Sequence, residues 1–557
     1  MKNKKILFLA ALSSFAVCAL SGCNKAPADN GTEDIKPLEI GDSKKKWSSG
    51  EDYDELPIIM EKNKGRGSII DDFGNEDDSS LYFELTKNSY IGSNLVTNPY
   101  FLEDDAKNGD IISLWYYLPE DCNIKTLKFE VVTSQTYNPQ TISDLQITVN
   151  ENYVGEWKKS SIIYNTLDTL GSLKLTYTLA DTTQVGKIYI DDIDITLGAE
   201  VVKTDYEYND ESLCEAYKDF FKVGTCMSSN MMRNTEIRKI TKHNFNSITA
   251  ENEGKPEQIL DQKECQKLAK QDETAVAITV APFEKIYDWA EANHIGVRHH
   301  TFVWYSQTPD WFFNKGYAQN GQKANKETML KRMENFIKVT LETINERWPG
   351  LVYAVDVANE AVENGGIRSN NNNWYTTVGS DFVYYAFKYA SQYKAEGQEL
   401  YYNDFAFDYN PSACTFALNN ILKKAIQEKL IDGVGIQGHL DSNANWDNVI
   451  NDAKQIKQKG LKCQITELDI TIQANNKQNL TQQSKAYETL VKKVIDNNIA
   501  GATDINAFVL WGINDNASWK SSQYPLLFTD NYGKKPAYYG LLNAVKDYLP
   551  EENEEEL

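Results

Sequence analysis

The chain has 557 residues, of which 41% are hydrophobic and 11% aromatic, and this is enough apolar material for more than one buried core. Its formal net charge of -23 repels the phosphate backbone of nucleic acids, whose binding depends on clustered Lys and Arg. Length and charge therefore argue against a single small domain and against a nucleic-acid partner.

The first residues have the pattern of an export signal. A lysine-rich start precedes an apolar run from Ile6 to Leu20, which is too short to span a membrane. The following Leu20-Ser21-Gly22-Cys23 resembles a bacterial lipobox, after which Cys23 would become the lipidated N-terminus. We therefore expect a lipoprotein signal peptide over residues 1–22 and, after export, a protein held by lipid at the cell outer membrane or cell surface. Either membrane face is compatible with this anchor, and an ordinary cleaved signal with an incidental cysteine is the alternative.

Residues 23–51 form a predicted linker, and residues 52–200 a predicted β domain. The linker is rich in Lys, Asp, Gly and Pro and has few large apolar residues. After it come short runs of alternating apolar and polar residues, such as Leu127–Val131, Leu145–Val149 and Ile188–Ile195, separated by Asn, Asp and Gly. Many short strands of period two, with almost no helical stretch, predict an all-β jelly-roll sandwich.

From about residue 205 to 550, strands alternate with amphipathic helices, as in parallel β/α units. Eight strands are predicted, over Phe221–Cys226, Phe245–Ala250, Gly296–Val303, Ala354–Val357, Leu400–Asn403, Gly433–Ile436, Cys463–Thr466 and Ala507–Trp511. A representative helix is predicted over Asp381–Ala390, with Ser380 as its N-cap. Eight repeats imply closure, so the α/β fold expected here is a (β/α)8 TIM barrel, which leaves an acidic tail over 551–557.

Six cysteines of the two predicted domains are widely scattered. They are Cys122, Cys214, Cys226, Cys265, Cys414 and Cys463, and none belongs to a C-x-x-C pair. This spacing does not suggest a metal cluster. An exported chain could pair some of them, but several lie in apolar runs, where a free cysteine behaves as a small hydrophobe, so both states stay open.

Polar side chains follow the predicted strands at the end of the barrel where active sites lie. The fourth strand is followed by Asn359 and Glu360, and the seventh by Glu467. Other strand ends carry Glu251, Asn252, His300, Gln437, His439 and Trp511. Each Glu alone is more simply read as a helix cap or a surface charge, but the recurrence of polar residues around one barrel favours an active site. Two carboxyl groups, one protonated and one ionised, are what glycosidic cleavage requires.

Several strings at these strand ends resemble those of the glycoside hydrolase family 10 xylanases. They are FKVGTC at 221–226, TAENEGKPE at 249–257, HTFVW at 300–304, VANEA at 357–361, GIQGHL at 435–440, ITELD at 465–469 and WGIND at 511–515. Their order and spacing match the family from about Leu213 to Leu549. The sequence is therefore identified as similar to this family over its second predicted domain.

The resemblance implies a retaining endo-1,4-β-xylanase that cuts internal bonds of xylan by double displacement, without a cofactor or metal. It implies Glu360 as acid/base and Glu467 as nucleophile, with xylan and xylo-oligosaccharides as partners. Substrate-binding roles are implied for Glu251, Asn252, Lys255, His300, Trp304, Gln307, Asn359, Gln437, His439, Trp511 and Trp519. In this scheme Asn359 bonds the sugar 2-hydroxyl, and Gln437 and His439 flank the nucleophile. Trp311 and Trp374, by contrast, are expected to pack in the core.

Departures from the family pattern leave the substrate preferences of the site open. Tyr305 stands where histidine is common, His299 where glycine is common, Gly254 where methionine is common and Val355 where tryptophan is common. The accepted xylan decorations therefore stay undefined. Two alternatives remain, a non-catalytic surface glycan-binding lipoprotein and an endo-β-glucanase of the same mechanism, and the intact pair of glutamates argues against the first.

The predicted sandwich is similar to carbohydrate-binding modules in its general pattern only. Five aromatic residues are candidates for a sugar platform, namely Trp115, Tyr116, Tyr117, Tyr137 and Trp157. Alternating strands bury about half of their aromatic side chains, so packing in the core is the competing interpretation. A spacer or docking domain is the alternative to sugar binding.

Overall fold

The structure is a computed structural model that describes residues 42–549, except 49, 57, 97, 99, 102–104 and 209–211. The predicted signal peptide, Cys23, most of the predicted linker and the acidic tail lie outside these residues. No helix in the described ranges has both the length and the apolar character needed to cross a membrane.

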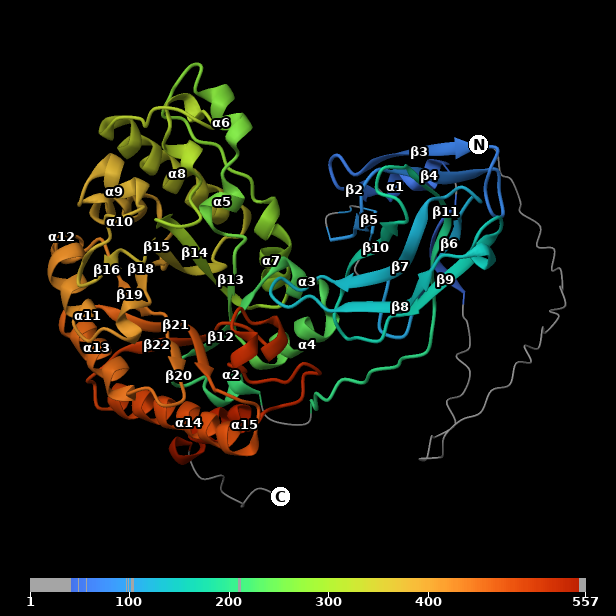
Figure 1. The fold of residues 1–557 in the computed structure, drawn as a ribbon. Helices are drawn as coiled ribbons and strands as arrows, with labels where there is room; N and C mark the ends of the chain where they lie inside the picture. The colour runs from blue at the N-terminus through green and yellow to red at the C-terminus, as the bar shows by residue number, and fades with distance from the viewer. Residues whose placement is uncertain are drawn as a thin grey trace, which may run out of the picture. The chain divides into compact units, whose positions relative to one another are not determined.

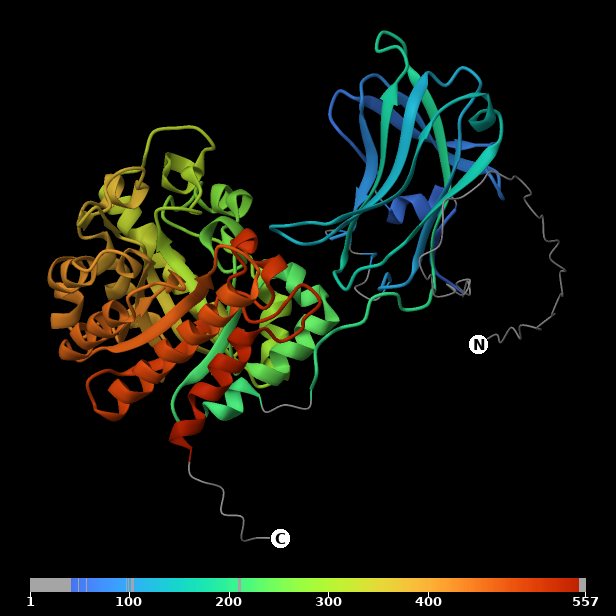
Figure 2. The ribbon, with the colours of Figure 1, turned by 60° about the horizontal axis from the view of Figure 1, so that its bottom comes forward.

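The N-terminal domain is an antiparallel sandwich of two sheets, as predicted. The first sheet has the order β3-β4-β11-β6-β9, with β1 paired to β11. Its strands are β1 (Ser43–Trp47), β3 (Gly65–Asp71), β4 (Ser79–Leu85), β6 (Ile111–Tyr117), β9 (Trp157–Ile163) and β11 (Gly186–Thr196). The second has the order β2-β5-β10-β7-β8 and consists of β2 (Ile59–Met60), β5 (Ser89–Asn94), β7 (Ile124–Thr133), β8 (Thr141–Thr148) and β10 (Leu170–Leu179). A short helix, α1 (Gly50–Glu55), follows β1, and Figure 2 shows the long strands side by side.

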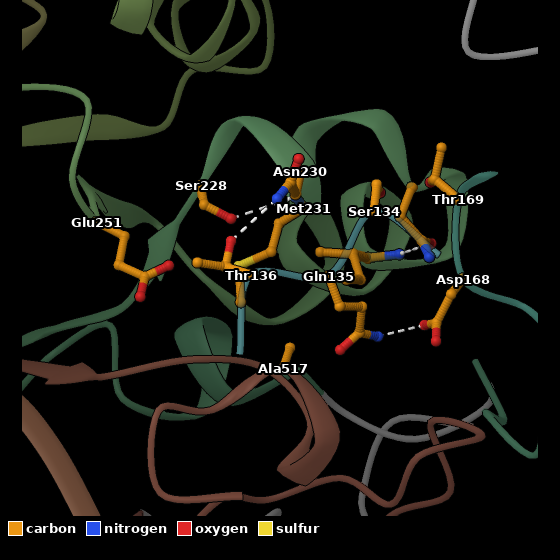
Figure 3. Close-up of a pocket in the computed structure, with 12 residues that line it drawn as sticks. Ser134, Gln135, Thr136, Asp168, Thr169, Ser228, Asn230, Met231, Glu251 and Ala517 are labelled. Atoms are coloured by element: carbon orange, nitrogen blue, oxygen red, sulfur yellow. Dashed lines mark hydrogen bonds between the residues drawn. The ribbon is translucent and has the colours of Figure 1, made fainter. Parts of the chain in front are cut away.

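Alternation along the strands explains why the two sheets pack together. In β7 and β10 every second side chain is buried, and these positions include Phe129, Val131, Leu173 and Leu175. Strands of this kind present one apolar face, which has to be covered by a second sheet. The core of the sandwich lies between the two faces. Near one end of β7, the side-chain amide of Gln135 donates to Asp168, as Figure 3 shows.

The second domain is a closed barrel of parallel strands, which confirms the predicted fold class (Figure 1). Its strands are β12 (Lys222–Met227), β13 (Ser247–Ala250), β14 (Gly296–Trp304), β15 (Val352–Asn359), β18 (Glu399–Asp404), β19 (Gly433–Ile436), β21 (Lys462–Thr471) and β22 (Ile505–Leu510). They pair in this order, and β22 closes the ring by pairing with β12. The predicted strands all overlap these elements.

Helices surround the strands, as Figure 1 and Figure 2 show. They are α2 (Leu213–Ala216), α3 (Ser229–Arg233), α4 (Thr235–Asn244), α5 (Pro256–Ile259), α6 (Gln262–Leu268), α7 (Ala281–Ala292), α8 (Lys326–Arg347), α9 (Asn373–Val378), α10 (Phe382–Tyr393), α11 (Ala413–Phe416), α12 (Lys423–Gln427), α13 (Trp446–Gln458), α14 (Lys477–Ile499) and α15 (Pro536–Ala544). Three short strands follow barrel strands in the sequence. They are β16 (Val362–Glu363) and β17 (Gly366–Ile367) after β15, and β20 (His439–Asp441) after β19. The buried face of each long helix packs against the barrel.

The predicted cap of α10 was wrong by one residue. The N-cap is Asp381 and not Ser380, and its side chain makes no capping hydrogen bond. Instead the amide of Phe382 donates to the carbonyl of Gly379, which ends α9 with a φ of 99°. The close junction of two helices therefore sets this boundary, and a junction of this kind leaves no side-chain signal in the sequence.

Two tryptophans and most of the cysteines are buried side chains. Trp311 and Trp374 are buried in the barrel core, as predicted. The six cysteines, whose pairing the sequence left open, are all free thiols, and five of them are buried.

Candidate active site

Glu360 and Glu467 both lie at the end of the barrel where the strands finish. Glu360 directly follows β15, and Glu467 lies within β21. Their exposed fractions are 9% and 5%. Since all barrel strands are parallel, their C-terminal ends meet on one face, which is where barrel enzymes place their reacting groups. The structure therefore brings the two predicted carboxyl groups to the same face.

The backbone at Glu360 has an unusual conformation that several contacts hold in place. Its φ is 53°, a left-handed value that costs energy for a residue other than glycine. Its amide donates to the carbonyl of Asn403 at 2.9 Å, and its carbonyl accepts from Arg368 Nε at 3.0 Å. The guanidinium of Arg368 also lies 4.1 Å from the ring centre of Tyr305. These contacts fix the direction in which the Glu360 side chain leaves the strand.

The Glu360 carboxyl group is surrounded by neutral donors. Gln437 Nε2 donates to one oxygen at 3.0 Å, and Trp304 Nε1 donates to the other at 2.8 Å. Burial raises the pKa of Glu360, the two donors oppose that shift, and the charge of Glu467 adds to it. Gln437 lies beside Glu467, as expected, because its carbonyl accepts from the amide of Glu467 at 2.8 Å, while its side-chain amide contacts Glu360.

The Glu467 carboxyl group has cationic neighbours. His439 Nε2 lies 3.2 Å from one oxygen, and Asn403 Nδ2 donates to the other at 2.8 Å. Burial alone would raise the pKa of Glu467, but the hydrogen bond from His439 and the charges of His300, His439 and Lys255 outweigh it and lower this pKa to about 2. Glu467 is therefore ionised at neutral pH.

A carboxylate behind His439 makes the imidazole cationic. Asp469 Oδ2 lies 2.8 Å from His439 Nδ1, and Trp519 Nε1 donates to the same oxygen at 3.0 Å. Burial would lower the pKa of His439, but the charge and hydrogen bond of Asp469, together with Glu467, raise it to about 10. A protonated His439 donates from both ring nitrogens, so it joins two carboxylates.

Lys255 is at the centre of a polar cluster beside the two carboxyl groups. Its ammonium donates to Asn252 Oδ1 at 2.9 Å and to Gln307 Oε1 at 3.1 Å. It also lies 5.0 Å from the ring centre of Trp304. Burial lowers the pKa of Lys255, and the charges of Glu467, Glu251 and Glu360 oppose that shift. The sequence predicted all of these residues as sugar ligands, and the structure gathers them.

Glu251 follows β13 and is almost completely buried. Burial raises the pKa of its carboxyl group to about 7, and the charge of Lys255 opposes this shift. Figure 3 shows Glu251 together with the start of helix α3, where Ser228 Oγ accepts from the amide of Met231 at 3.3 Å. Its high pKa means that Glu251 can act as either donor or acceptor toward a ligand near neutral pH.

His300 and Trp511 line the barrel end between these groups. His300 Nδ1 lies 2.8 Å from Asp356 Oδ2, and Asp356 also accepts from the buried guanidinium of Arg298. The rings of His300 and Trp511 are 5.9 Å apart, and Trp511 is 7% exposed. Trp519 differs, because 46% of its surface is exposed. The two predicted aromatic walls are therefore one buried ring and one exposed ring.

Hydrogen bonds connect the two halves of the site through Asn359 and Asn403. Asn403 Nδ2, which already donates to Glu467, lies 3.0 Å from Asn359 Oδ1, and Gln437 Nε2 lies 3.5 Å from the same oxygen. The sequence predicted Asn359 but missed Asn403. A signal was present, since Asn403 ends the fifth predicted strand, where polar residues are informative.

The described residues contain no group of three or more His, Cys, Asp or Glu side chains arranged to bind a metal ion. The arrangement is thus one of two carboxyl groups with opposite pKa shifts, surrounded by amides, a lysine, imidazoles and indoles. Such a set can transfer a proton and supply a carboxylate nucleophile at the same time.

Comparisons with known proteins identify the family. The model of glycosyl hydrolase family 10 matches residues 212–544. The bifunctional endo-1,4-β-xylanase XylA of Ruminococcus flavefaciens is 42% identical over 342 residues, which are 60% of this chain and 34% of that protein. Endo-1,4-β-xylanase Y of Acetivibrio thermocellus is 33% identical over 429 residues, which are 73% of this chain and 38% of that protein. The matched regions thus cover little more than a third of these relatives.

A solved structure extends the likeness to both domains. The CBM22-1 and GH10 modules of a Clostridium thermocellum endo-1,4-β-D-xylanase, determined with xylohexaose, align with a TM-score of 0.58 and 26% identity. The alignment covers 89% of this chain and 96% of that one. The family match spans more than half of the sequence, and so the chain belongs to glycosyl hydrolase family 10.

Proposed function

We propose that this protein is a retaining endo-1,4-β-xylanase that hydrolyses internal bonds of xylan. The observation that carries the proposal is the opposite pKa shift of two buried glutamates, raised for Glu360 and lowered to about 2 for Glu467. Retaining hydrolysis needs this division between an acid and a nucleophile. Membership of family 10 and the xylanases among its relatives support xylan as the substrate.

In the first step, a Glu467 oxygen attacks the anomeric carbon and the bond to the leaving oxygen breaks. Glu360 gives its proton to that oxygen, so a neutral sugar hydroxyl departs and a glycosyl ester forms on Glu467. Asn403 donates to one Glu467 oxygen and His439 to the other, so both hold the nucleophile in place. Asn359 would bond the 2-hydroxyl of the reacting sugar.

In the second step, Glu360 acts as a base. Once Glu467 is esterified its negative charge is gone, so one cause of the raised pKa of Glu360 disappears. Glu360 then takes a proton from water, the water oxygen bonds to the anomeric carbon, and Glu467 leaves as a carboxylate. Gln437 and Trp304 stabilise the ionised Glu360 by donating to its two oxygens.

The remaining polar residues would bind the sugar on the glycone side. Lys255, with Asn252 and Gln307, offers donors and acceptors to sugar hydroxyls, and Glu251 and His300 extend this set. Trp511 and Trp519 would pack against the C–H faces of the sugars. Xylan and xylo-oligosaccharides are therefore the proposed ligands of this face of the barrel.

The test is product analysis with the purified protein lacking residues 1–23. We expect reducing ends to appear on xylan, with internal cleavage products, and NMR should show the β-anomer first, because double displacement retains configuration. Cleavage of β-1,4-glucan alone would favour the endo-β-glucanase alternative. Binding of xylan without any release of sugar would favour the glycan-binding lipoprotein.

A second proposal concerns sugar binding by the sandwich. Phe73, Tyr82, Tyr117, Trp157 and Tyr189 form a half-buried aromatic cluster, in which neighbouring rings lie 4.7 to 5.9 Å apart. Tyr117 and Trp157 were predicted platform residues, whereas Tyr116 belongs to the core. The partial exposure of the cluster supports contact with a sugar chain. Trp157→Ala should weaken retention on insoluble xylan and leave turnover of short soluble substrates unchanged; unchanged retention would contradict the proposal.

The proposed location is the outer membrane or cell surface, with Cys23 lipidated. This rests on the lipobox-like Leu20-Ser21-Gly22-Cys23. In cells fed labelled palmitate, the wild-type chain should carry label and sediment with membranes, while Cys23→Ala should do neither. Equal labelling of both forms would contradict the anchor.

A further inference from the structure

A short loop serves both catalytic carboxyl groups at once. It runs from the end of β19 to the first residue of β20 and consists of Gln437, Gly438 and His439, and we call it the 437–439 loop. The Gln437 side chain donates to Glu360, and His439 contacts Glu467. The backbone of this one loop therefore sets both contacts.

The loop packs closely against β21. Gly438 has a φ of 83°, which favours glycine. A Cβ atom at this position would lie 3.1 Å from Ile465 and 3.3 Å from Leu468, both in β21. The loop therefore has no room to move toward β21. Its position depends on the contacts that it makes on the side facing away from β21.

On that other side a single carboxyl group accepts hydrogen bonds from two backbone amides of the loop. Asp408 Oδ1 accepts from the amide of Gly438 at 2.8 Å, and Asp408 Oδ2 accepts from the amide of His439 at 2.8 Å. On the β21 side, the carbonyl of Gln437 accepts from the amide of Glu467 at 2.8 Å. The loop is thus held between β21 and Asp408, which ends the 3-10 helix η4 (Ala406–Asp408).

We propose that Asp408 is a positioning residue for both catalytic glutamates, acting through the 437–439 loop. The proposal rests on the glycosidase function proposed above. Burial raises the pKa of Asp408 to about 7, while the charge of His439 and the two amide hydrogen bonds oppose that shift and favour the ionised form. Loss of this acceptor would leave two buried backbone amides without it. One side chain therefore links the position of Gln437 to that of His439.

Loss of Asp408 should shift the pH dependence of kcat/KM in one direction. The bond from Gln437 lowers the pKa of Glu360, and the bond and charge of His439 lower the pKa of Glu467. If the loop moves away, both pKa values rise. The acidic limb of the pH profile of kcat/KM reports the nucleophile and the basic limb reports the acid, so both limbs should move to higher pH.

The experiment compares Asp408→Asn with the wild type, each without residues 1–23, on xylan and on an aryl β-xylobioside. Asn keeps the shape but loses one acceptor and the charge. We expect kcat to fall about 10- to 100-fold, the cost of a misplacement near 1 Å, while KM changes less than about threefold. Both limbs should move up by about half a pH unit or more. An unchanged kcat, or a lower kcat with unmoved limbs, would overturn the proposal.

Two further variants keep the result decisive. Asp452 on α13 is a buried carboxyl group close enough to interact electrostatically with Asp408, and it accepts from Gln455 instead of from the loop. Asp452→Asn should leave both limbs in place, and an equal shift would assign the effect to buried charge and overturn the proposal. If Asp408→Asn does not fold, Asp408→Glu keeps the charge but moves it by one methylene, and it should shift both limbs upward by less. Unmoved limbs in that variant would also overturn the proposal.

Failure of the proposed function gives a different result. If the wild-type chain turns over neither substrate, the xylanase proposal fails before any variant is compared. The loop can then be examined through the imidazole NMR signals of His439, whose pKa is raised to about 10 by Asp469 and Glu467. Asp408→Asn should shift that titration and Asp452→Asn should not; an unshifted titration in Asp408→Asn would overturn the positioning role on its own.

Discussion

Glu360 and Glu467 occupy equivalent places at the ends of barrel strands, and both are buried, yet their surroundings differ in one respect. Neutral groups donate to both oxygens of Glu360, the amide of Gln437 and the indole of Trp304. Glu467 is contacted by protonated His439 and lies in the field of His300 and Lys255. Burial raises the pKa in both cases, so it cannot be what separates them.

The difference shows that the charge of the neighbours, rather than the depth of burial, assigns the two roles. Asp469 is the origin of this charge, since it raises the pKa of His439 to about 10 and thus keeps the imidazole protonated beside Glu467. The two donors of Glu360 are an amide and an indole, which are uncharged at any ordinary pH, and the charge of Arg368 lowers the pKa of Glu360 less than these donors do. The residues that contact the two carboxyl groups therefore determine which carboxyl group is the acid and which is the nucleophile.

The largest effect should follow from removing the nucleophile. Glu467→Ala should lower turnover of xylan on the order of 10⁴- to 10⁶-fold, as loss of a nucleophile does in other hydrolases. Added azide should take the place of the missing carboxylate on an aryl xylobioside and yield an α-glycosyl azide, because it attacks the face that Glu467 occupied. NMR of the product identifies the anomer. A β-azide would reverse the assignment of the two glutamates.

Removing the acid should have a smaller effect that depends on the leaving group. Glu360→Ala should slow xylan hydrolysis about 10²- to 10⁴-fold and spare cleavage of substrates whose leaving group needs no proton. Azide should accelerate breakdown of the glycosyl-enzyme and give a β-glycosyl azide, since Glu467 still forms the intermediate. Steady-state rates on dinitrophenyl and unactivated xylobiosides measure this. An equal loss on both substrates would contradict the role of Glu360.

The sequence predicted the residues that follow strands more reliably than the partners of those residues. Buried parallel strands are short apolar runs, so their ends could be found within a few residues, and with them Glu251, His300, Glu360 and Glu467. The position of Gln437 beside Glu467 was predicted, but the contact of its side chain with Glu360 was not. The left-handed turn at Gly438 sends the side chains on either side of it to different neighbours, and a linear string does not contain that direction.

Residues that act from the loops after the strands were missed for a related reason. Asp408 meets the 437–439 loop over a sequence separation of 30 and 31 residues, and Arg368 reaches the Glu360 carbonyl from beyond a hairpin. The first contact depends on how two neighbouring strand ends are placed, and the second, over eight residues, depends on the path of the hairpin between Glu360 and Arg368. An Asp or Arg in a loop is most often a solvated charge, so composition alone gave no reason to select them.

Substitution of His439 removes the cation that contacts Glu467. His439→Gln keeps a donor but loses the positive charge, so the pKa of Glu467 should rise and the acidic limb of the kcat/KM profile should move to higher pH by about one unit. The basic limb should stay in place, because Gln437 and Trp304 still contact Glu360. This separates His439→Gln from Asp408→Asn, for which both limbs move. An unmoved acidic limb would show that the charge of His439 does not set the pKa of Glu467.

The smallest effect is expected from the neutral side of the site. Trp304→Phe keeps an aromatic ring near Lys255 but removes the indole N–H that donates to Glu360 Oε2 at 2.8 Å. That bond lowers the pKa of Glu360, so its loss should raise the pKa and move the basic limb to higher pH. Since the ionised form is needed only in the second step, kcat should fall about two- to fivefold, mainly where breakdown of the glycosyl-enzyme limits the rate. A shift of the acidic limb instead would mean that Trp304 acts on Glu467, and the division between neutral and charged neighbours would then fail.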